Sequence, residues 1–324
     1  MSHPSSNEAA HPRPRVAVSA CLLGEQVRYD GAHKRDRYIT DQLAQLIDFV
    51  PVCPEVEAGL GVPRPTIQLR KIENEIRVVR SDDAAVDVTE QIDAVAEKRA
   101  QQLTGEISGF ILKKKSPSCG MERVPVAIAQ GRPHDRSGIG RFAQTFHRLA
   151  PLIPLEEEGR LCDAALRENF LERVYALHRW QQLDLTQPSS LVEFHARHKF
   201  MLMARGGDWY VRLGRIVAGV TRENMHDRAT AYIQHFMQVM ARVVTRKRQI
   251  NVLQHAMGYL KQDLAAADKQ ELLEVFQAYR HAYVPLAAPL TLLRHHLRKH
   301  PQEYLARQHY FEPYPDALAL RAAI

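Results

Sequence analysis

Three short apolar runs in the first half of the chain each lead into a turn that carries a cysteine. The runs and their cysteines are Val16–Ala20 with Cys21, Phe49–Val52 with Cys53, and Gly109–Leu112 with Cys119. Apolar runs that break into glycine, proline or serine turns are typical of buried strands in an α/β sheet, which deliver side chains to the edge where parallel strands end. We therefore expect the three cysteines to meet at one edge of a mostly parallel sheet.

Helix and strand patterns alternate through this half. Helical periodicity covers 37–49, 86–104, 137–149 and 163–182, and further strand patterns cover 66–70, 75–79 and 152–155. Beyond a polar linker at 186–190 only helical patterns follow, over 191–204, 223–246, 251–264, 269–283, 286–299 and 302–310. This order predicts a disordered tail at 1–15, an α/β domain with a mostly parallel sheet at 16–184, and an all-α domain at 190–324.

Composition is that of a globular protein without a membrane segment. Of its 324 residues 45% are hydrophobic, no run approaches 18 apolar residues, and the first 15 residues lack the apolar stretch of a signal peptide. These features predict a cytoplasmic location, and nothing in the sequence indicates an obligate protein partner. In a reducing compartment the four cysteines are expected to serve metal binding, catalysis or core packing rather than disulfides.

The spacing of Cys21, Cys53 and Cys119 matches neither a zinc ribbon nor a compact ferredoxin motif, because they are 32 and 66 residues apart. Thiolates select zinc, copper or an iron–sulfur cluster. A [4Fe–4S] cluster held by three cysteines leaves one iron open as a Lewis acid for a substrate sulfur. The alternative is that the cysteines are ordinary core residues. Cys162, just before the expected helix N-cap Asp163, is treated as ordinary, although a role as fourth ligand stays open.

Polar residues near these cysteines suit proton transfer and substrate binding. Glu55 is the expected acid or base, and Ser116 is the expected positioned hydroxyl, although Ser118 is equally near. Lys113, Ser118 and Arg64 are expected to contact the substrate, with Arg64 suited to a phosphate. Taken singly, each residue also fits an ordinary role in a loop or turn.

Three segments of the first half together resemble the thiouracil desulfidase family. They are Ser-Ala-Cys-Leu-Leu-Gly with Val-Arg-Tyr-Asp-Gly in 19–31, Cys-Pro-Glu with Gly-Leu and Pro-Arg in 53–64, and Ile-Leu-Lys with Ser-Pro-Ser-Cys-Gly in 111–120. The resemblance covers residues 14–160 and implies an enzyme that removes sulfur from thiopyrimidines without net redox change. It implies a [4Fe–4S] cluster with Cys21, Cys53 and Cys119 as ligands, and Glu55 and Ser116 as catalytic residues.

Residues 190–315 resemble the helical domain of unknown function found in YbgA-like proteins. The two domains in combination are similar to the bacterial tRNA 4-thiouridine desulfidases, which convert that nucleoside in tRNA to uridine. The resemblance therefore implies tRNA as the partner and a thiopyrimidine nucleoside as the substrate.

The basic excess of the chain lies in its helical half. The net charge is +7, and the residues from 186 onward hold 19 Lys and Arg against 11 Asp and Glu. The candidate RNA-binding residues are Arg246, Lys247, Arg248, Arg298 and Lys299. Phosphates attract such cations, and the nearby His255 and Tyr259 suit base stacking. The alternative is a solvated helix face, or a helix C-terminus whose dipole favours cations.

The leading prediction is a desulfidase that removes sulfur from 4-thiouridine in tRNA by non-redox hydrolysis. A second hypothesis is an RNA-binding or sensing protein whose cluster is structural and has a fourth protein ligand. A desulfidase of free thiouracil or thio-nucleotides, and a zinc-dependent nucleoside enzyme, are further alternatives.

Overall fold

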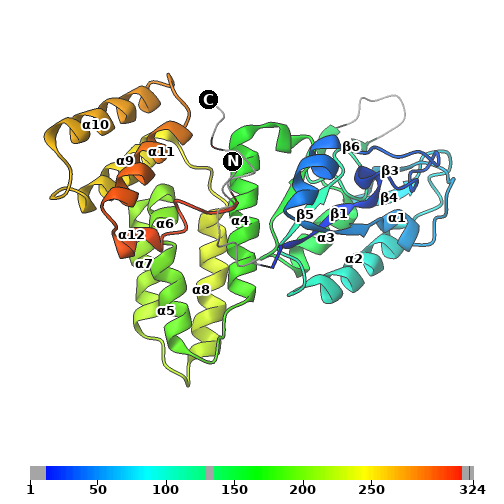
Figure 1. Cartoon of the computed structure of the whole chain (residues 1–324). Helices are drawn as coiled ribbons and strands as arrows, with labels where there is room; N and C mark the ends of the chain where they lie inside the picture. The colour runs from blue at the N-terminus through cyan, green and yellow to red at the C-terminus, as the bar shows by residue number, and fades with distance from the viewer. Residues whose placement is uncertain (1–11, 129–134, 316–320, 322–324) are drawn as a thin grey trace. The chain divides into compact units, whose positions relative to one another are not determined.

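A computed structural model describes residues 12–128, 135–315 and 321 of the chain (Figure 1). The chain divides into two units, Met1–Glu158 and Gly159–Ile324. Residues 1–11 of the predicted N-terminal tail lie outside the described residues, and the first strand already begins at Arg15. Within the described parts of the chain, no helix has the length and apolar character needed to cross a bilayer.

The first unit contains a four-stranded parallel sheet. Its strands are β1 (Arg15–Ser19), β2 (Asp48–Val52), β5 (Gly109–Leu112) and β8 (Leu155–Glu157), in the order β2-β1-β5-β8. Val18 pairs with Pro51 on one side and with Ile111 on the other, so three neighbouring strands end at the same edge. Every residue of β5 is buried, which explains its unbroken apolar sequence. The predicted parallel sheet is confirmed.

The first unit also has a second four-stranded sheet, with the strand order β4-β3-β6-β7. The strand patterns in the sequence did not separate this sheet from the first. Its strands are β3 (Ile67–Ile72), β4 (Glu75–Arg80), β6 (Val124–Ala127) and β7 (Asp135–Gly138). The outer pairs are antiparallel and the central pair is parallel. The hairpin of β3 and β4 was predicted. The strands β6 and β7 were not predicted, because each is short and β7 has no apolar alternation.

Helices pack beside the parallel sheet. They are α1 (Pro54–Glu57), α2 (Thr89–Leu103) and α3 (Arg141–Leu149). The helices α2 and α3 lie side by side (Figure 1), and Arg141 forms a forked hydrogen bond to Asp93 of α2 at 2.6–2.9 Å. Phe142 and Phe146 of α3 pack on Phe110 of β5, with ring centroids 5.8 and 5.3 Å apart. The predicted helix at 37–49 is instead two short turns, because the chain enters β2 at Asp48.

The second unit is helical throughout its described residues. Its helices are α4 (Ala164–Gln181), α5 (Pro188–Arg197), α6 (Lys199–Arg205), α7 (Gly207–Ala218), α8 (Met225–Met240), α9 (Arg246–Tyr259), α10 (Ala266–Arg280), α11 (Ala287–Lys299) and α12 (Glu303–Ala306). Within this unit α7 packs against both α5 and α8, and α9, α10 and α11 form a second group (Figure 1). The all-α prediction is confirmed.

The helix α4 belongs to the second unit, whereas the sequence analysis assigned residues up to 184 to the first domain. Glu172 of α4 forms a buried ion pair with Arg205 of α6, and Trp180 stacks on Tyr232 of α8 with centroids 5.8 Å apart. These contacts bury α4 among the other helices. The chain therefore changes unit after Glu158 and not at the polar linker.

The basic segment of the helical unit lies at the start of a helix. We expected one helix to run through 223–246 and the next to begin at Asn251. Instead α8 ends at Met240 and α9 begins at Arg246. The segment predicted as one helix at 191–204 is two helices, α5 and α6, and α7 was not predicted because its glycines look like helix breakers.

Candidate active site

The three cysteines of the first unit lie at the ends of neighbouring parallel strands. Cys21 follows β1 in a short 3-10 turn, Cys53 follows β2 at the N-cap of α1, and Cys119 lies in the turn after β5. The strand order β2-β1-β5 brings these ends to one edge of the sheet. The thiols are close enough to interact electrostatically, since Cys53 and Cys21 both act on Cys119.

The donor set of the three thiols suits an iron–sulfur cluster. Soft thiolates are the ligands that such clusters take, and a polynuclear group presents separate metal atoms to ligands that come from different strand ends. Cys21, Cys53 and Cys119 supply three such ligands at one edge of the sheet.

Burial keeps these thiols protonated in the metal-free protein. It raises the pKa of Cys21 to about 11, with a further contribution from Cys53. Burial likewise raises the pKa of Cys53 and of Cys119, against a hydrogen bond from Ser19 that lowers the latter. Since metals bind the thiolate, loading this site releases protons.

Glu55 is the centre of a hydrogen-bonded network beside the thiols. Its Oε2 accepts hydrogen bonds from Nε and Nη2 of Arg64 at 3.0 and 2.7 Å, and its Oε1 accepts one from the Ser118 hydroxyl at 2.6 Å. The Ser118 and Ser116 hydroxyl oxygens are 2.9 Å apart. Ser116 Oγ also accepts the backbone N–H groups of Ser118 and Cys119 at 3.2 and 3.1 Å. Its own proton is thus left to donate to Ser118, which in turn donates to Glu55.

The two serines have different places in this network. Ser118 is fully buried and bonds directly to Glu55, whereas Ser116 is half-buried and one step further away. The arrangement gives a directional chain of hydroxyls, from Ser116 through Ser118 to the carboxylate. Such a chain can carry a proton between a half-buried hydroxyl and a partly buried carboxylate.

Arg64 makes its hydrogen bonds to protein groups. Its side chain is 4% exposed, pairs with Glu55, and donates to the Gly61 carbonyl at 2.8 Å. Because its donors face protein groups, Arg64 is suited to orienting Glu55 rather than to holding a substrate phosphate.

Lys113 is held by an acidic residue that the sequence analysis missed. Its ammonium pairs with Glu158, which also accepts the backbone N–H of Lys114 at 2.7 Å. The backbone N–H of Lys113 donates to Ser19 Oγ at 3.0 Å. Glu157, the preceding residue, accepts the backbone N–H of Met121 at 2.7 Å. The signal was present in the sequence, since three consecutive glutamates follow the strand pattern predicted at 152–155.

The start of α3 fixes the turn that carries Cys119. The backbone N–H groups of Arg141 and Ala143 donate to the carbonyls of Pro117 and Ser118 at 2.9 and 3.1 Å. A Cβ atom on Gly140 would lie 2.5 Å from the Ser118 carbonyl oxygen, so this position requires glycine. The turn is therefore held by a helix end as well as by its own internal hydrogen bonds.

Cys162 has a different setting. It is exposed, lies in the short turn Arg160–Cys162, and belongs to the second unit.

The predicted RNA-binding residues fall into two groups. Arg246, Lys247 and Arg248 occupy the first turn of α9, which contains no acidic residue. A helix N-terminus repels cations and attracts anions, so the helix dipole does not explain this cluster. Arg298 and Lys299 lie in the last turn of α11, where the dipole does favour cations.

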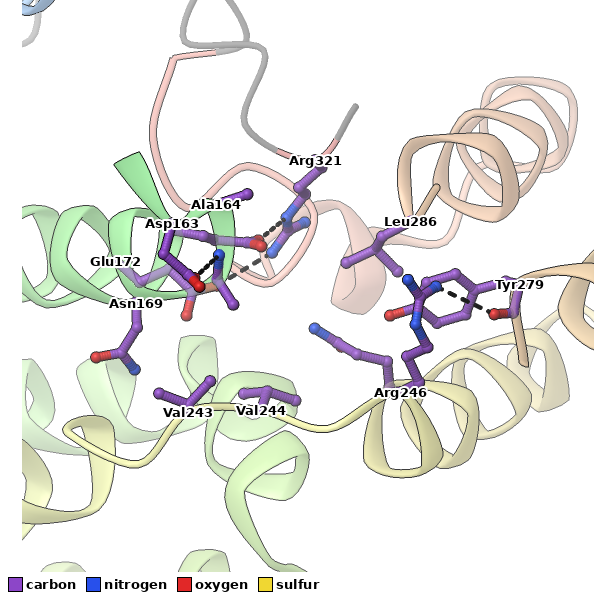
Figure 2. Close-up of a pocket in the computed structure, with 13 residues that line it drawn as sticks. Asp163, Ala164, Asn169, Glu172, Val243, Val244, Arg246, Tyr279, Leu286 and Arg321 are labelled. Carbon is purple, nitrogen blue, oxygen red and sulfur yellow. Dashed lines mark hydrogen bonds and ion pairs between the residues drawn. The ribbon is translucent and has the colours of Figure 1, made fainter. Parts of the chain in front are cut away.

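Arg246 faces a pocket within the helical unit (Figure 2). The pocket has a volume of about 390 Å³ and is bordered by α4, α9 and α10. The Arg246 guanidinium lies over the Tyr279 ring, 5.1 Å from its centroid, and donates to the Tyr279 carbonyl at 3.3 Å. Across the pocket Arg321 pairs with Glu168 and Glu172 at 2.8 and 3.2 Å. Of the three cations in the first turn, Lys247 and Arg248 are the exposed ones.

An aromatic cluster surrounds Lys199 at the other end of α9. The Lys199 ammonium lies 5.4–5.9 Å from the ring centroids of Tyr210, Tyr259 and Tyr304, and bonds the Tyr259 hydroxyl at 3.3 Å. Tyr259 and Tyr304 stack with centroids 5.5 Å apart, and Tyr304 is exposed. The cluster combines a cation with partly exposed aromatic rings, which is the chemistry that takes nucleic-acid phosphates and bases.

Two family models match separate parts of this chain. One, described as 2-thiouracil desulfurase, matches residues 16–158. The other, described as a protein of unknown function, DUF1722, matches residues 199–315.

The chain is also similar to known proteins. It is 30% identical over 158 residues to the uncharacterized protein YbgA of Escherichia coli (strain K12), across 48% of this chain and 93% of YbgA. It is 28% identical over 134 residues to the uncharacterized protein YbbK of Bacillus subtilis (strain 168), across 38% of this chain and 85% of YbbK. A solved structure of the [4Fe-4S]-dependent thiouracil desulfidase TudS shares 32% identity over 48% of this chain and 98% of its own, with a TM-score of 0.40. The chain therefore carries a 2-thiouracil desulfurase domain at residues 16–158, followed by a YbgA-like DUF1722 domain in the same polypeptide.

Proposed function

We propose that this protein removes sulfur from 4-thiouridine in tRNA and leaves uridine. The observation that carries the proposal is the arrangement of three thiols at neighbouring strand ends, beside the Glu55–Ser118–Ser116 chain. Cys21, Cys53 and Cys119 would hold a [4Fe–4S] cluster. The match of residues 16–158 to the 2-thiouracil desulfurase model supports a thiopyrimidine as the reacting group.

The reaction is a hydrolysis. Water adds its oxygen to C4 of the base, the C4–S bond breaks, and the sulfur leaves as hydrogen sulfide with the two hydrogens of the water. No electrons are exchanged with a second substrate. When bound, the cluster supplies a Lewis-acidic metal corner suited to sulfur.

The residues of this chain supply proton transfer and orientation. Ser116 is the half-buried end of the hydroxyl chain and would take a proton from the attacking water. Ser116 would give its own proton to Ser118, and Ser118 its own to Glu55 Oε1, to which it is bonded at 2.6 Å. Transfer of that proton from Glu55 to the departing sulfur would restore the carboxylate. Arg64 holds the other carboxylate oxygen and so fixes the direction in which Glu55 accepts the proton.

The helical unit would bind the tRNA. Two features support this role: the exposed Lys247 and Arg248 in the first turn of α9, and the aromatic cluster around Lys199. Cations provide the salt-dependent part of RNA affinity, and aromatic rings provide stacking on unpaired bases.

The test uses anaerobically reconstituted protein and tRNA that contains 4-thiouridine. We expect iron and sulfide at four of each per chain and loss of the near-UV absorption of the thionucleoside. Cys53→Ala should abolish both cluster and activity, and Cys162→Ala, the matched control, should keep them. Activity that survives in Cys53→Ala would refute the proposed chemistry.

A free thiopyrimidine is the second candidate substrate, because the matching family is described by 2-thiouracil. The two candidates are separated by giving the enzyme thiouracil, a thio-nucleotide and thiolated tRNA in parallel. Turnover of the free compounds without turnover of tRNA would reject the tRNA substrate and leave the desulfidase chemistry in place.

A further inference from the structure

His296 is a buried histidine whose ring nitrogens have no hydrogen-bond partner. It lies on the inner face of α11 and is 3% exposed. Neither Nδ1 nor Nε2 contacts a donor or acceptor among the described residues. A buried polar atom without a partner destabilises the fold, and native proteins rarely leave one in that state. A ligand bonded to the imidazole would remove this destabilisation.

Two carboxylates of the neighbouring helix face this imidazole. Asp268 and Glu271 are three residues apart on α10, which places them on one side of that helix, and α10 packs against α11. One oxygen of each carboxylate and one ring nitrogen of His296 all lie within 4.8 Å of one another. Two carboxylates at this separation repel each other unless a cation lies between them.

We propose that Asp268, Glu271 and His296 bind a divalent transition-metal ion, Mn²⁺ or Zn²⁺. One such ion gives the orphaned imidazole a partner and neutralises both carboxylates. A donor set of one imidazole nitrogen and two carboxylate oxygens is borderline in softness and suits these ions. The thiol site differs, since its ligands are all sulfur.

The ion would join α10 to α11. Beyond this cluster the inner faces of the two helices carry apolar side chains, among them Leu272, Phe276 and Leu293. Glu271 is exposed, so solvent reaches the site and the ion can exchange. The proposed site does not depend on the desulfidase chemistry, because all three ligands lie in the helical unit.

Equilibrium dialysis of the full-length protein against Mn²⁺ and, separately, Zn²⁺ tests the proposal, with bound metal counted per chain. We expect the double variant Asp268→Asn/Glu271→Gln to bind one ion fewer than wild type for at least one of the two metals. His296→Leu, which fills the same space with an apolar side chain, should lose the same ion. The control Asp263→Asn/Glu274→Gln makes the same charge change at and near α10 and should bind as wild type does.

Comparison between variants removes the contribution of the cysteines, which are the same in all of them. The metal should also raise the unfolding temperature of wild type by more than that of the double variant, because binding only the folded state stabilises it. Equal binding by wild type and the double variant for both metals would overturn the proposal. So would a loss in the double variant that His296→Leu does not share, since the acidic pair would then bind without the imidazole.

Discussion

Glu55 is held on two sides by residues from distant parts of the chain. Arg64 comes from the loop after α1, and Ser118 comes from the turn after β5. The carboxylate is therefore fixed in position before any substrate arrives. Its two oxygens have different partners, since one accepts hydrogen bonds from a permanent cation and the other accepts one from a hydroxyl that can donate and accept a proton.

Ser118→Ala should lower the turnover number by about 100-fold or more, because it interrupts the hydroxyl chain that ends at Glu55. Ser116→Thr, which keeps a hydroxyl at the open end, should retain far more activity than Ser116→Ala. Steady-state kinetics on thiolated tRNA measures both. Ser137→Ala, at an exposed serine of β7, is the matched control. A Ser118→Ala enzyme with wild-type turnover would contradict the relay.

Two buried histidines of the helical unit make its stability depend on pH. Burial lowers the pKa of His195 from 6.5 to about 4 and that of His198 well below its usual value. Below pH 6.5 the unfolded chain binds protons that the folded chain does not. The free energy of unfolding contributed by these groups is therefore complete above pH 6.5 and falls as the pH drops toward 4.

Unfolding temperatures at pH 7.5 and pH 5 check this expectation. Wild type should lose more stability on acidification than His195→Gln, which has no titrating ring, and each kcal/mol of the difference corresponds to about 2–4 °C. His235→Gln, at an exposed histidine of α8, should behave as wild type. Identical pH profiles for wild type and His195→Gln would show that His195 titrates alike in the folded and unfolded states.

At the scale of elements, the ends of helices and strands carry the functional groups of this molecule. The cysteines follow β1, β2 and β5, and α3 begins against the carbonyls of the turn before Cys119. In the helical unit the first turn of α9 carries three cations where its dipole already presents positive charge. Such a turn is unfavourable in isolation and becomes favourable when it meets phosphates.

Lys247→Glu should therefore weaken tRNA binding about tenfold and reduce the slope of log affinity against log salt by about 1. Turnover of a free thio-nucleotide should stay unchanged, because the substitution lies outside the cysteine-bearing unit. Lys98→Glu, an exposed position on α2, makes the same charge change and serves as the control. Affinity titrations at several salt concentrations give the result, and equal losses in the two variants would argue against α9 as the RNA surface.

At the scale of the whole molecule, the chain is two units of different class joined after Glu158. The match to the 2-thiouracil desulfurase family ends at the same residue. The helical unit begins with α4, which supplies Glu172 as the partner of the buried Arg205. A helical fragment without α4 would leave that guanidinium buried and unpaired.

A fragment of residues 159–324 should fold, and a fragment of residues 190–324 should not. Loss of one member of a buried ion pair costs about 3–5 kcal/mol, and the packing surface of α4 is lost with it. Far-UV circular dichroism and cooperative thermal unfolding compare the two fragments. If the shorter fragment unfolds as cooperatively as the longer one, α4 is dispensable to this unit.

Local sequence patterns were enough to predict the fold class of each half and the positions of the three cysteines at strand ends. These features follow from local patterns, because β-branched runs, turn residues and helical periodicity act over a few neighbouring residues. The polar residues near the cysteines, Glu55, Ser116 and Ser118, were likewise visible as their neighbours in the sequence.

Only the tertiary structure decided which of these groups touch. It gave Glu55 the partners Arg64 and Ser118, paired Lys113 with Glu158, and moved α4 into the helical unit. It also placed the basic segment at the start of α9 rather than at the end of α8. Each of these outcomes depends on packing between segments far apart in the sequence, and burial fixes such pairings through contacts that no local pattern encodes.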